Sequence, residues 1–238
     1  MLTSRIKRRL ALMHAALIDL LHAPLWRRRP DPYDAIFPQF IEAVRAMPAP
    51  TIVELGSRNV TGTTRRALFP DAGRYVGCDV HPGEGVDQVL DVHRLSEVFA
   101  PGSVDAIFSI SVFEHLVFPW KVALEINKVL KPGGLVFVST HPAWPPHELP
   151  WDFWRFPEAG LAHLFAPITG FEVLSVSEGA PAKLYALKTD PQTRKIRQFH
   201  ANLGVGLLAR KTHDYDADKL RWDVDMDQAV RTEYPRPA

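Results

Sequence analysis

The stretch 51–79 constrains the fold of this chain more than any other. An apolar strand at 51–55 runs into a turn that opens with Gly56. A second glycine, Gly62, precedes an expected helix, and the strand that follows closes on Asp79. A strand, a glycine turn, a helix and a second strand that ends on an acid are typical of a nucleotide-binding crevice.

The acid before the glycine turn indicates which ligand this crevice takes. Glu54 lies two residues before Gly56, where its carboxylate would repel a pyrophosphate placed on the following helix. Gly56 and Gly62 do not follow the G-x-G-x-x-G spacing, and no Gly-Lys-Ser/Thr ends the loop. Asp79 is placed as an acceptor for ribose hydroxyls. S-adenosylmethionine, which has an ammonium, a sulfonium and a ribose but no phosphate, fits this charge pattern.

Helical and strand patterns alternate along most of the chain. We predict strands at 51–55, 74–79, 87–91, 104–110, 135–140, 171–176 and 205–210, helices at 33–46, 63–69, 95–99 and 119–130, and a partly helical stretch at 183–200. Such alternation predicts an α/β fold of the Rossmann-like, doubly wound type. Its sheet should have seven mostly parallel strands with helices on both faces, preceded by N-terminal helices.

The N-terminal segment differs in charge from the rest of the chain. The net charge of all 238 residues is +1, yet residues 1–30 hold seven Lys or Arg against one acid. Apolar residues recur at helical spacing over 3–21, which predicts an amphipathic helix too short in its apolar stretch to span a bilayer. Two interpretations stay open: the helix packs on the domain, which we favour, or it rests on an anionic membrane face.

The composition limits the domain organisation and the partners. We expect a basic helix at 1–30, one domain at 31–211 with a substrate or lid loop at 141–157, and a tail at 212–238. The single cysteine, Cys78, fits a reducing compartment and therefore a cytoplasmic location, peripheral at the membrane if the leader binds there. No Cys/His spacing suggests a metal site, and no basic patch with interleaved aromatic residues suggests nucleic-acid binding.

Five segments together resemble a known family. VELGSRNVTG, YVGCDV, QVLDV, DAIFSISVFEHL and VLKPGGLVFVSTH occur in the order found in class I S-adenosylmethionine-dependent methyltransferases. The resemblance covers about residues 37–211. It is closest to the type 11 branch, whose members often act on small molecules or sugars. The resemblance implies an enzyme that transfers a methyl group, with S-adenosylmethionine as its cofactor.

The resemblance also implies where the cofactor lies. Glu54 and Gly56, with Ser57 beside them, are expected at the methionine end, Asp79 at both ribose hydroxyls, Val80 on the adenine, Asp91 at the adenine amino group with Val92 beside it, and Ser109 and Ile110 under the sulfonium. Members of the family usually have a denser glycine run, which Arg58, Asn59 and Val60 replace here. The turn must therefore differ in shape from that of the family.

The acceptor is expected at the ends of the next two strands. His115 and His141 are candidates for the base that takes a proton from an acceptor hydroxyl, and Glu114 is an alternative base or orienting group. The proline-rich loop that follows has residues suited to a sugar or a flat ring: Trp144, Trp151, Trp154 and Phe156 as aromatic faces, with Asp152 and Arg155 as polar anchors. The predicted acceptor is a small molecule or a glycan.

Two other functions compete with this hypothesis. A catalytically inactive methyltransferase-like scaffold would use the basic leader to reach a membrane or a partner. A nicotinamide-dependent oxidoreductase is disfavoured by Glu54 and by the missing glycines.

Overall fold

The computed structural model describes residues 4–26, 30–60, 62–184 and 199–226. Two compact units separate at the boundary between Asp31 and Pro32. The first contains helix α1 (Ser4–Trp26), and its apolar residues Leu10, Met13 and Leu17 have no second element within that unit to pack against. Within the described part of the chain, we find no helix whose length and hydropathy would carry it through a membrane.

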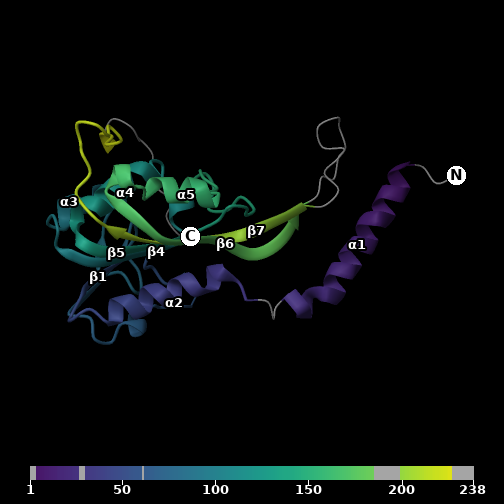
Figure 1. Ribbon diagram of the computed structural model, residues 1–238, viewed down its shortest axis with the longest axis horizontal. Helices are drawn as coiled ribbons and strands as arrows, with labels where there is room; N and C mark the ends of the chain where they lie inside the picture. The colour runs from purple at the N-terminus through teal and green to yellow at the C-terminus, as the bar shows by residue number, and fades with distance from the viewer. Residues whose placement is uncertain (1–3, 27–29, 61, 185–198, 227–238) are drawn as a thin grey trace. The chain divides into compact units, whose positions relative to one another are not determined.

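The second unit is a seven-stranded sheet with helices on both faces, as predicted (Figure 1). Its elements are α2 (Pro32–Arg45), β1 (Thr51–Leu55), η1 (Arg66–Leu68), β2 (Arg74–Asp79), β3 (Gln88–Val89), η2 (Val92–Arg94), α3 (Leu95–Val98), β4 (Val104–Ile110), η3 (Phe113–His115), α4 (Pro119–Val129), β5 (Leu130–Thr140), α5 (Glu158–Leu164), η4 (Pro167–Thr169), β6 (Phe171–Leu184) and β7 (Phe199–Lys211). Here η denotes a 3₁₀ turn.

The strand order is β3-β2-β1-β4-β5-β7-β6. Strands β1 to β5 run parallel to one another. Strand β7 lies between β5 and β6 and runs antiparallel to both. Helix α2 covers one face, while α3, α4 and α5 lie over the other (Figure 1). The sheet is therefore mostly parallel, with one antiparallel hairpin at its edge.

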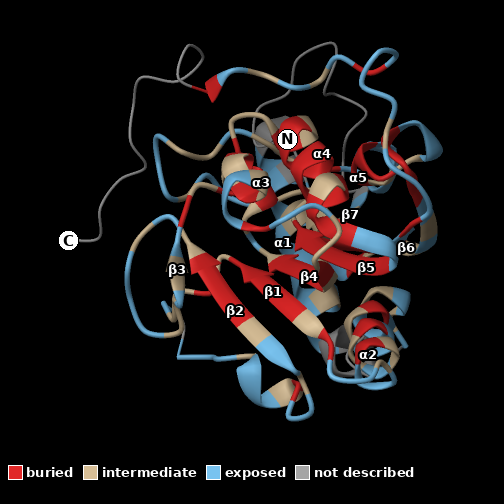
Figure 2. Cartoon of the chain, turned by 90° about the vertical axis from the view of Figure 1, so that its left-hand side faces the viewer, coloured by how far each residue is buried: buried red, intermediate tan, exposed pale blue. Residues whose placement is uncertain are grey.

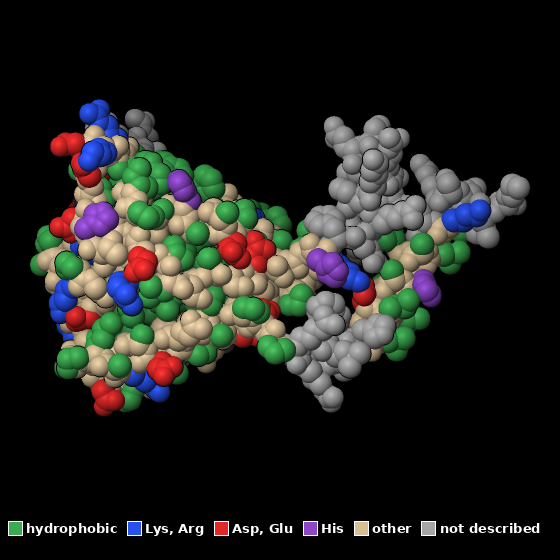
Figure 3. Space-filling model, in the orientation of Figure 1, with side chains coloured by type: hydrophobic (Ala, Val, Ile, Leu, Met, Phe, Trp, Pro, Cys, Tyr) green, Lys and Arg blue, Asp and Glu red, His purple; other side chains and the backbone are tan. Residues whose placement is uncertain are grey.

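Both faces of the central strands are buried, which explains their nearly continuous apolar runs (Figure 2). Alternate residues of β4 serve the two sides: Phe108 packs under α2, against Phe40 and Phe137, while Ile107 joins the core on the opposite face. On the face of this unit seen in Figure 3, acidic and basic side chains are interspersed among apolar ones.

Two predicted helical segments differ from the structure, and one helix of the structure was not expected. The helix expected at 63–69 is only the 3₁₀ turn η1, because Gly62 and two β-branched threonines are poor helix formers. Of the partly helical stretch at 183–200, both ends belong to β6 and β7, and 185–198 lie outside the described residues. Helix α5 was not predicted.

The segment after β7 is attached to the domain rather than extended from it. Asp223 forms ion pairs with Lys121 and Lys128 of α4. Leu220 is buried, and Trp222 packs against the core on the α4 face. Residues 212–226 therefore form an ordered cover for α4.

Candidate functional site

The carboxyl ends of four neighbouring parallel strands meet at one edge of the sheet. The registers pair Leu55 of β1 with Ser109 of β4, and Ile110 of β4 with Ser139 of β5. Crevices of open α/β sheets form outside such strand ends. The predicted cofactor and acceptor residues follow these strands, so the fold brings both sets to the same edge.

The turn after β1 requires glycine for two reasons. Gly56 has a φ of 79°, and its N–H and that of Ser57 donate to the carbonyl of Cys78 at 2.8 and 3.0 Å. A Cβ on residue 56 would lie 2.3 Å from Val112 Cγ2. The turn is thus packed directly on the segment that follows β4.

Glu54 is buried, and two protein groups hold its carboxylate. It accepts a hydrogen bond from the Tyr75 hydroxyl, and Arg65 Nη1 lies 3.4 Å from its Oε1. Burial raises the pKa of Glu54 above its ordinary value, although the contacts with Tyr75 and Arg65 oppose the rise. The predicted discriminating acid is therefore a partly compensated buried charge.

Asp79 lies at the end of β2 as predicted, half-buried. Its carboxylate accepts from His81 N at 3.0 Å and from Arg58 N at 3.4 Å, and Arg58 Nε lies 3.7 Å away. The adjacent Val80 is 42% exposed, as an apolar surface for a ring requires. Arg58, which replaces a family glycine, thus lies on the carboxylate expected to bind the ribose.

Asp91 and Val92 are tied into a local cap. Asp91 Oδ1 accepts from His93 N at 3.0 Å and lies 2.6 Å from His93 Nδ1. Burial alone would raise the pKa of Asp91, but the hydrogen bonds from His93 outweigh it and hold the pKa below its ordinary value. Val92 is buried. Asp91 therefore has a structural role in the turn, beside any contact with an adenine.

Buried polar atoms without a hydrogen-bond partner gather at this edge. Among the described residues they are Ser57 Oγ, Arg58 Nε, Asn59 Oδ1, Ser109 Oγ and Glu114 Oε1. Such orphan atoms are rare in folded proteins and call for a ligand, a water molecule or an ion. Three belong to the Gly56 turn and two to the segment at and after β4. Together they outline a polar binding site at the predicted place.

Glu114 and three histidines form the acceptor end of the edge. Glu114 is fully buried in η3, and its Oε2 accepts from Thr140 Oγ1 at 2.7 Å. The Nε2 atoms of His141, His115 and His147 lie 3.3, 3.9 and 4.0 Å from its Oε1. The structure therefore brings the two candidate histidines, His115 and His141, next to Glu114. Sequence reasoning missed His147, whose only signal was its place in a loop dense in ionisable residues.

The loop 141–157 divides into an inner and an outer part. Trp154 donates its indole N–H to Leu116 O at 2.7 Å and packs on Trp120, and Phe156 is buried. These two side chains pack on the domain, because the loop folds back onto α4 and η3. They are therefore not available as aromatic faces for an acceptor, unlike the prediction. Trp144 is 42% exposed and stacks on His141, with ring centroids 4.5 Å apart.

The outer part of the loop is held by an ion pair. Arg155 donates from Nη1 and Nη2 to the two carboxylate oxygens of Asp152 at 2.5 and 2.7 Å. This pairing holds the pKa of Asp152 well below its usual range. Trp151 is half-buried, and its carbonyl lies 2.5 Å from His115 Nδ1. The predicted polar anchors therefore bind each other and position the loop.

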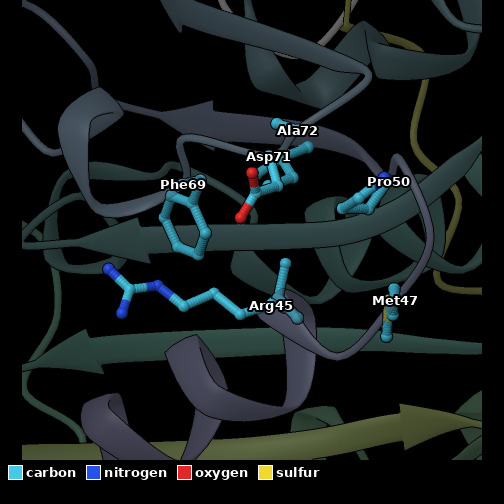
Figure 4. A pocket seen from close by; sticks show the side chains of 8 residues that line it. Arg45, Met47, Pro50, Phe69, Asp71 and Ala72 are labelled. Atoms are coloured by element: carbon cyan, nitrogen blue, oxygen red, sulfur yellow. The ribbon is translucent and has the colours of Figure 1, made fainter.

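Two hollows in the described structure lie away from this edge. One, shown in Figure 4, is lined by Arg45, Met47, Pro50, Phe69, Asp71 and Ala72. Pro50 precedes β1, so this hollow is at the opposite, amino end of the strand. The other, of about 270 Å³, lies between α4 and residues 224–226. Neither is lined by the predicted site residues.

Comparisons with known proteins agree with the fold. Residues 54–138 match the model of a methyltransferase domain. An uncharacterized methyltransferase of Mycolicibacterium paratuberculosis is 30% identical over 132 residues, 49% of this chain and 48% of the relative. A ubiquinone biosynthesis O-methyltransferase of Nitrosococcus oceani is 43% identical over 53 residues, 22% of each chain. The chain thus spans about half or less of the length of these curated relatives.

A solved structure extends the likeness to about three quarters of the chain. An S-adenosylmethionine-dependent methyltransferase from Archaeoglobus fulgidus superposes with a TM-score of 0.53 at 12% identity, over 74% of this chain and 92% of that one. The fold and the matched domain define a Rossmann-like methyltransferase domain. Residues 54–138 are thus similar to a methyltransferase domain, and the fold is that of an S-adenosylmethionine-dependent methyltransferase.

Replacing Gly56 tests the close packing at the turn. Gly56→Ala should destabilise the protein by about 1–2 kcal/mol through its left-handed conformation, and by about 1–3 kcal/mol more through the clash with Val112. The matched control is Gly133→Ala, where φ is 82° and no atom lies within 4 Å of the new Cβ. Denaturant unfolding measures both. Equal losses at the two positions, or no recovery in Gly56→Ala/Val112→Ala, would contradict the packing argument.

The raised pKa of Glu54 predicts a pH-dependent stability difference. A carboxyl whose pKa is higher in the folded state stabilises the fold below its unfolded pKa, and this contribution is lost as pH rises through the folded pKa. Relative to Glu54→Gln, the wild type should therefore lose unfolding free energy as pH rises above the ordinary value of 4.5. Urea unfolding of both proteins over this range measures the difference, and a difference that stays constant with pH would refute the shift.

Proposed function

We propose that the protein transfers a methyl group from S-adenosylmethionine to a hydroxyl of a small-molecule or glycan acceptor. The observation that carries this proposal is the gathering of orphan polar atoms at the carboxyl ends of β1 and β4. A polar ligand seated there satisfies them, and the family of the chain supplies its identity. Because the chain covers about half or less of its curated relatives, its own activity is a proposal.

The residues at the edge fit the cofactor by their chemistry. Among the described residues, Ser57 Oγ, Asn59 Oδ1 and Ser109 Oγ lack hydrogen-bond partners. Asp79 accepts from the backbone N–H groups of Arg58 and His81, and Arg58 Nε lies 3.7 Å from it. We assign Asp79 to the ribose hydroxyls, Val80 to the adenine face, and the Gly56 turn with Ser109 and Ile110 to the methionine end. When bound, the cofactor supplies an electrophilic methyl group on a sulfonium.

Glu114 and the neighbouring histidines align the acceptor hydroxyl and promote the loss of its proton. Methyl transfer is an in-line displacement in which the new O–C bond forms as the S–C bond breaks, so the protein chiefly has to align the reacting atoms. The acceptor hydroxyl also loses its proton. Glu114, His115 and His141 stand after the strand ends assigned to the methionine end, and they are the groups placed to activate that hydroxyl.

The acceptor class follows from what the loop leaves exposed. Trp144 and the half-buried Trp151 offer aromatic faces, while Asp152 and Arg155 are already paired. An acceptor with a flat or sugar-like face fits this surface better than a charged one. The O-methyltransferase among the relatives is consistent with a hydroxyl acceptor.

Replacing Asp79 tests the cofactor assignment. Asp79→Ala should weaken binding of S-adenosylhomocysteine by about 10- to 100-fold, because hydrogen bonds to a charged group contribute about 1.5–3 kcal/mol. Isothermal titration calorimetry measures the affinity, with the exposed Asp71→Ala as the matched control. If the wild type does not bind S-adenosylhomocysteine, the proposed function fails.

A membrane-recruited scaffold without catalysis is the second candidate. It is favoured by the contacts that already hold Asp79 and Glu54, namely Arg58, Arg65 and Tyr75. The basic charge of residues 1–30 and the apolar side chains along α1 suit an anionic bilayer.

Vesicle binding separates the two candidates. The full chain should sediment with vesicles that contain anionic lipid and not with neutral ones, and the chain without residues 1–30 should sediment with neither. Each Lys or Arg near the surface contributes about 1 kcal/mol, so binding should weaken steeply with salt. Vesicle binding together with no S-adenosylhomocysteine binding supports the scaffold; equal sedimentation of the truncated chain excludes the helix as the anchor.

A further inference from the structure

We propose that Glu114, His115, His141 and His147 bind a divalent transition-metal ion at the acceptor end of the site. The four side chains come from η3, from the end of β5 and from the loop that follows it. This differs from the sequence-based expectation that the chain has no metal site, because the residues have no metal-binding spacing and meet only in the fold.

Three of the donor atoms converge: Glu114, His115 and His147 each offer a ligand atom within 4.8 Å of the other two. His141 is outside that group of three, but its Nε2 lies 3.3 Å from Glu114 Oε1, so it can join the ion from the Glu114 side after a shift towards the other two rings. A tetrahedral ion with bonds of about 2.0–2.2 Å holds its ligand atoms roughly 3.3–3.6 Å apart. The distances of 3.9 and 4.0 Å from His115 and His147 to Glu114 thus need only a slight contraction.

Each imidazole is oriented by its other nitrogen. Nδ1 of His115, His141 and His147 lies 2.5, 2.9 and 3.1 Å from a backbone carbonyl, that of Trp151, Leu203 and Pro145 respectively. A carbonyl oxygen only accepts, so Nδ1 carries the proton and the lone pair of a neutral ring is on Nε2. Metal-binding histidines almost always show this arrangement. In all three rings, Nε2 faces Glu114.

The buried carboxylate is incompletely satisfied without a cation. Glu114 is fully buried, Thr140 serves Oε2, and Oε1 has no hydrogen-bond partner. No Lys or Arg forms an ion pair with it among the described residues. Burying a charge without a partner is costly. A metal ion between Oε1 and the imidazoles supplies the missing charge. The hydroxyl of Ser111, 3.3 Å from His141 Nε2, is the competing partner of that nitrogen.

The surrounding chain holds the ligands in place. Ser111 has a φ of 55°, a left-handed conformation that turns the chain sharply after β4 and precedes η3. On the loop, Asp152 is held by Arg155 and accepts from His147 N at 3.0 Å. Preorganisation of this kind is what a metal site requires.

The ligand set indicates the class of metal. Three imidazoles and one carboxylate suit Zn²⁺ and neighbouring transition ions, whereas Mg²⁺ and Ca²⁺ prefer oxygen ligands. The one cysteine, Cys78, is buried in β2 and offers no thiolate here. Solvent reaches the cluster through His147, whose side chain is 30% exposed.

The role of the ion rests on the proposed function. An imidazole whose Nε2 lone pair binds a metal cannot also accept a proton, so the ion replaces His115 and His141 as the activating group. A bound Lewis acid lowers the pKa of a hydroxyl that coordinates it. With the ion bound, the acceptor hydroxyl would lose its proton to solvent more readily, and its oxygen would form the new O–C bond as the S–C bond of the sulfonium breaks.

Metal binding by the full chain tests the inference. After treatment with a chelator and removal of the chelator, titration with Zn²⁺ against a chromophoric competitor should show one tightly bound ion per chain. Co²⁺ should bind with the visible absorption of a four- or five-coordinate site. Glu114→Gln and His147→Gln should each weaken Zn²⁺ binding at least about 100-fold, a larger effect than the 10- to 100-fold typical of residues that only support ligands. The matched control is His163→Gln, an exposed histidine of α5.

The outcomes separate this inference from the proposed function. Circular dichroism checks that each variant folds; if Glu114→Gln does not, His147→Gln, on the surface loop, carries the test. Asp79→Ala should keep the ion while losing S-adenosylhomocysteine. A chain that binds the ion but not S-adenosylhomocysteine upholds the metal site and overturns the proposed function. Zn²⁺ binding that is absent, or equal in wild type and His147→Gln, overturns the metal site.

Discussion

The close approach of Gly56 to Val112 is the contact on which the site depends. Val112 Cγ2 occupies the space that a Cβ of residue 56 would need. Because only glycine permits this, the turn after β1 can lie directly against the segment after β4. Two residues beyond Val112 is Glu114, with its histidines. The contact therefore brings the Gly56 turn next to Glu114 and its histidines. Neither group is positioned by a regular α-helix.

Two buried glutamates at this edge differ in how the protein compensates their carboxylates. Glu54 is enclosed but receives the Tyr75 hydroxyl and the Arg65 guanidinium, so the protein itself compensates it. Glu114 is more deeply buried and receives only Thr140 and the ring edges of histidines. The same residue type therefore differs in its surroundings: the carboxylate of Glu54 is bound by protein groups beside the Gly56 turn, whereas Glu114 Oε1 has no hydrogen-bond partner. Burial alone does not identify the functional acid; its partners do.

The sequence could predict those features that depend on local pattern. The apolar runs at 51–55 and 104–110 identified central strands, and the acid after 74–78 identified the carboxyl end of β2. The helix expected at 63–69 was wrong because the strand, glycine turn and second strand suggested a helix between them, whereas glycine and threonine are poor helix formers. Phe156 was predicted to face an acceptor but lies in the core. The composition of an aromatic loop does not show whether its side chains face a ligand or the core. His147 could not be recognised, since its nearness to Glu114 depends on the fold of a long loop.

The antiparallel hairpin of β6 and β7 fixes the orientation of the His141 ring, which no local sequence motif predicts. Strand β7 enters between β5 and β6, and it places the carbonyl of Leu203 2.9 Å from His141 Nδ1. That contact determines which nitrogen of His141 is protonated and turns Nε2 towards Glu114. The tautomer of a residue after the fifth strand thus depends on a residue of β7 that lies more than sixty positions later. If the three rings served only as bases, one such orientation would suffice; three rings oriented in the same way towards one carboxylate oxygen favour a shared cation.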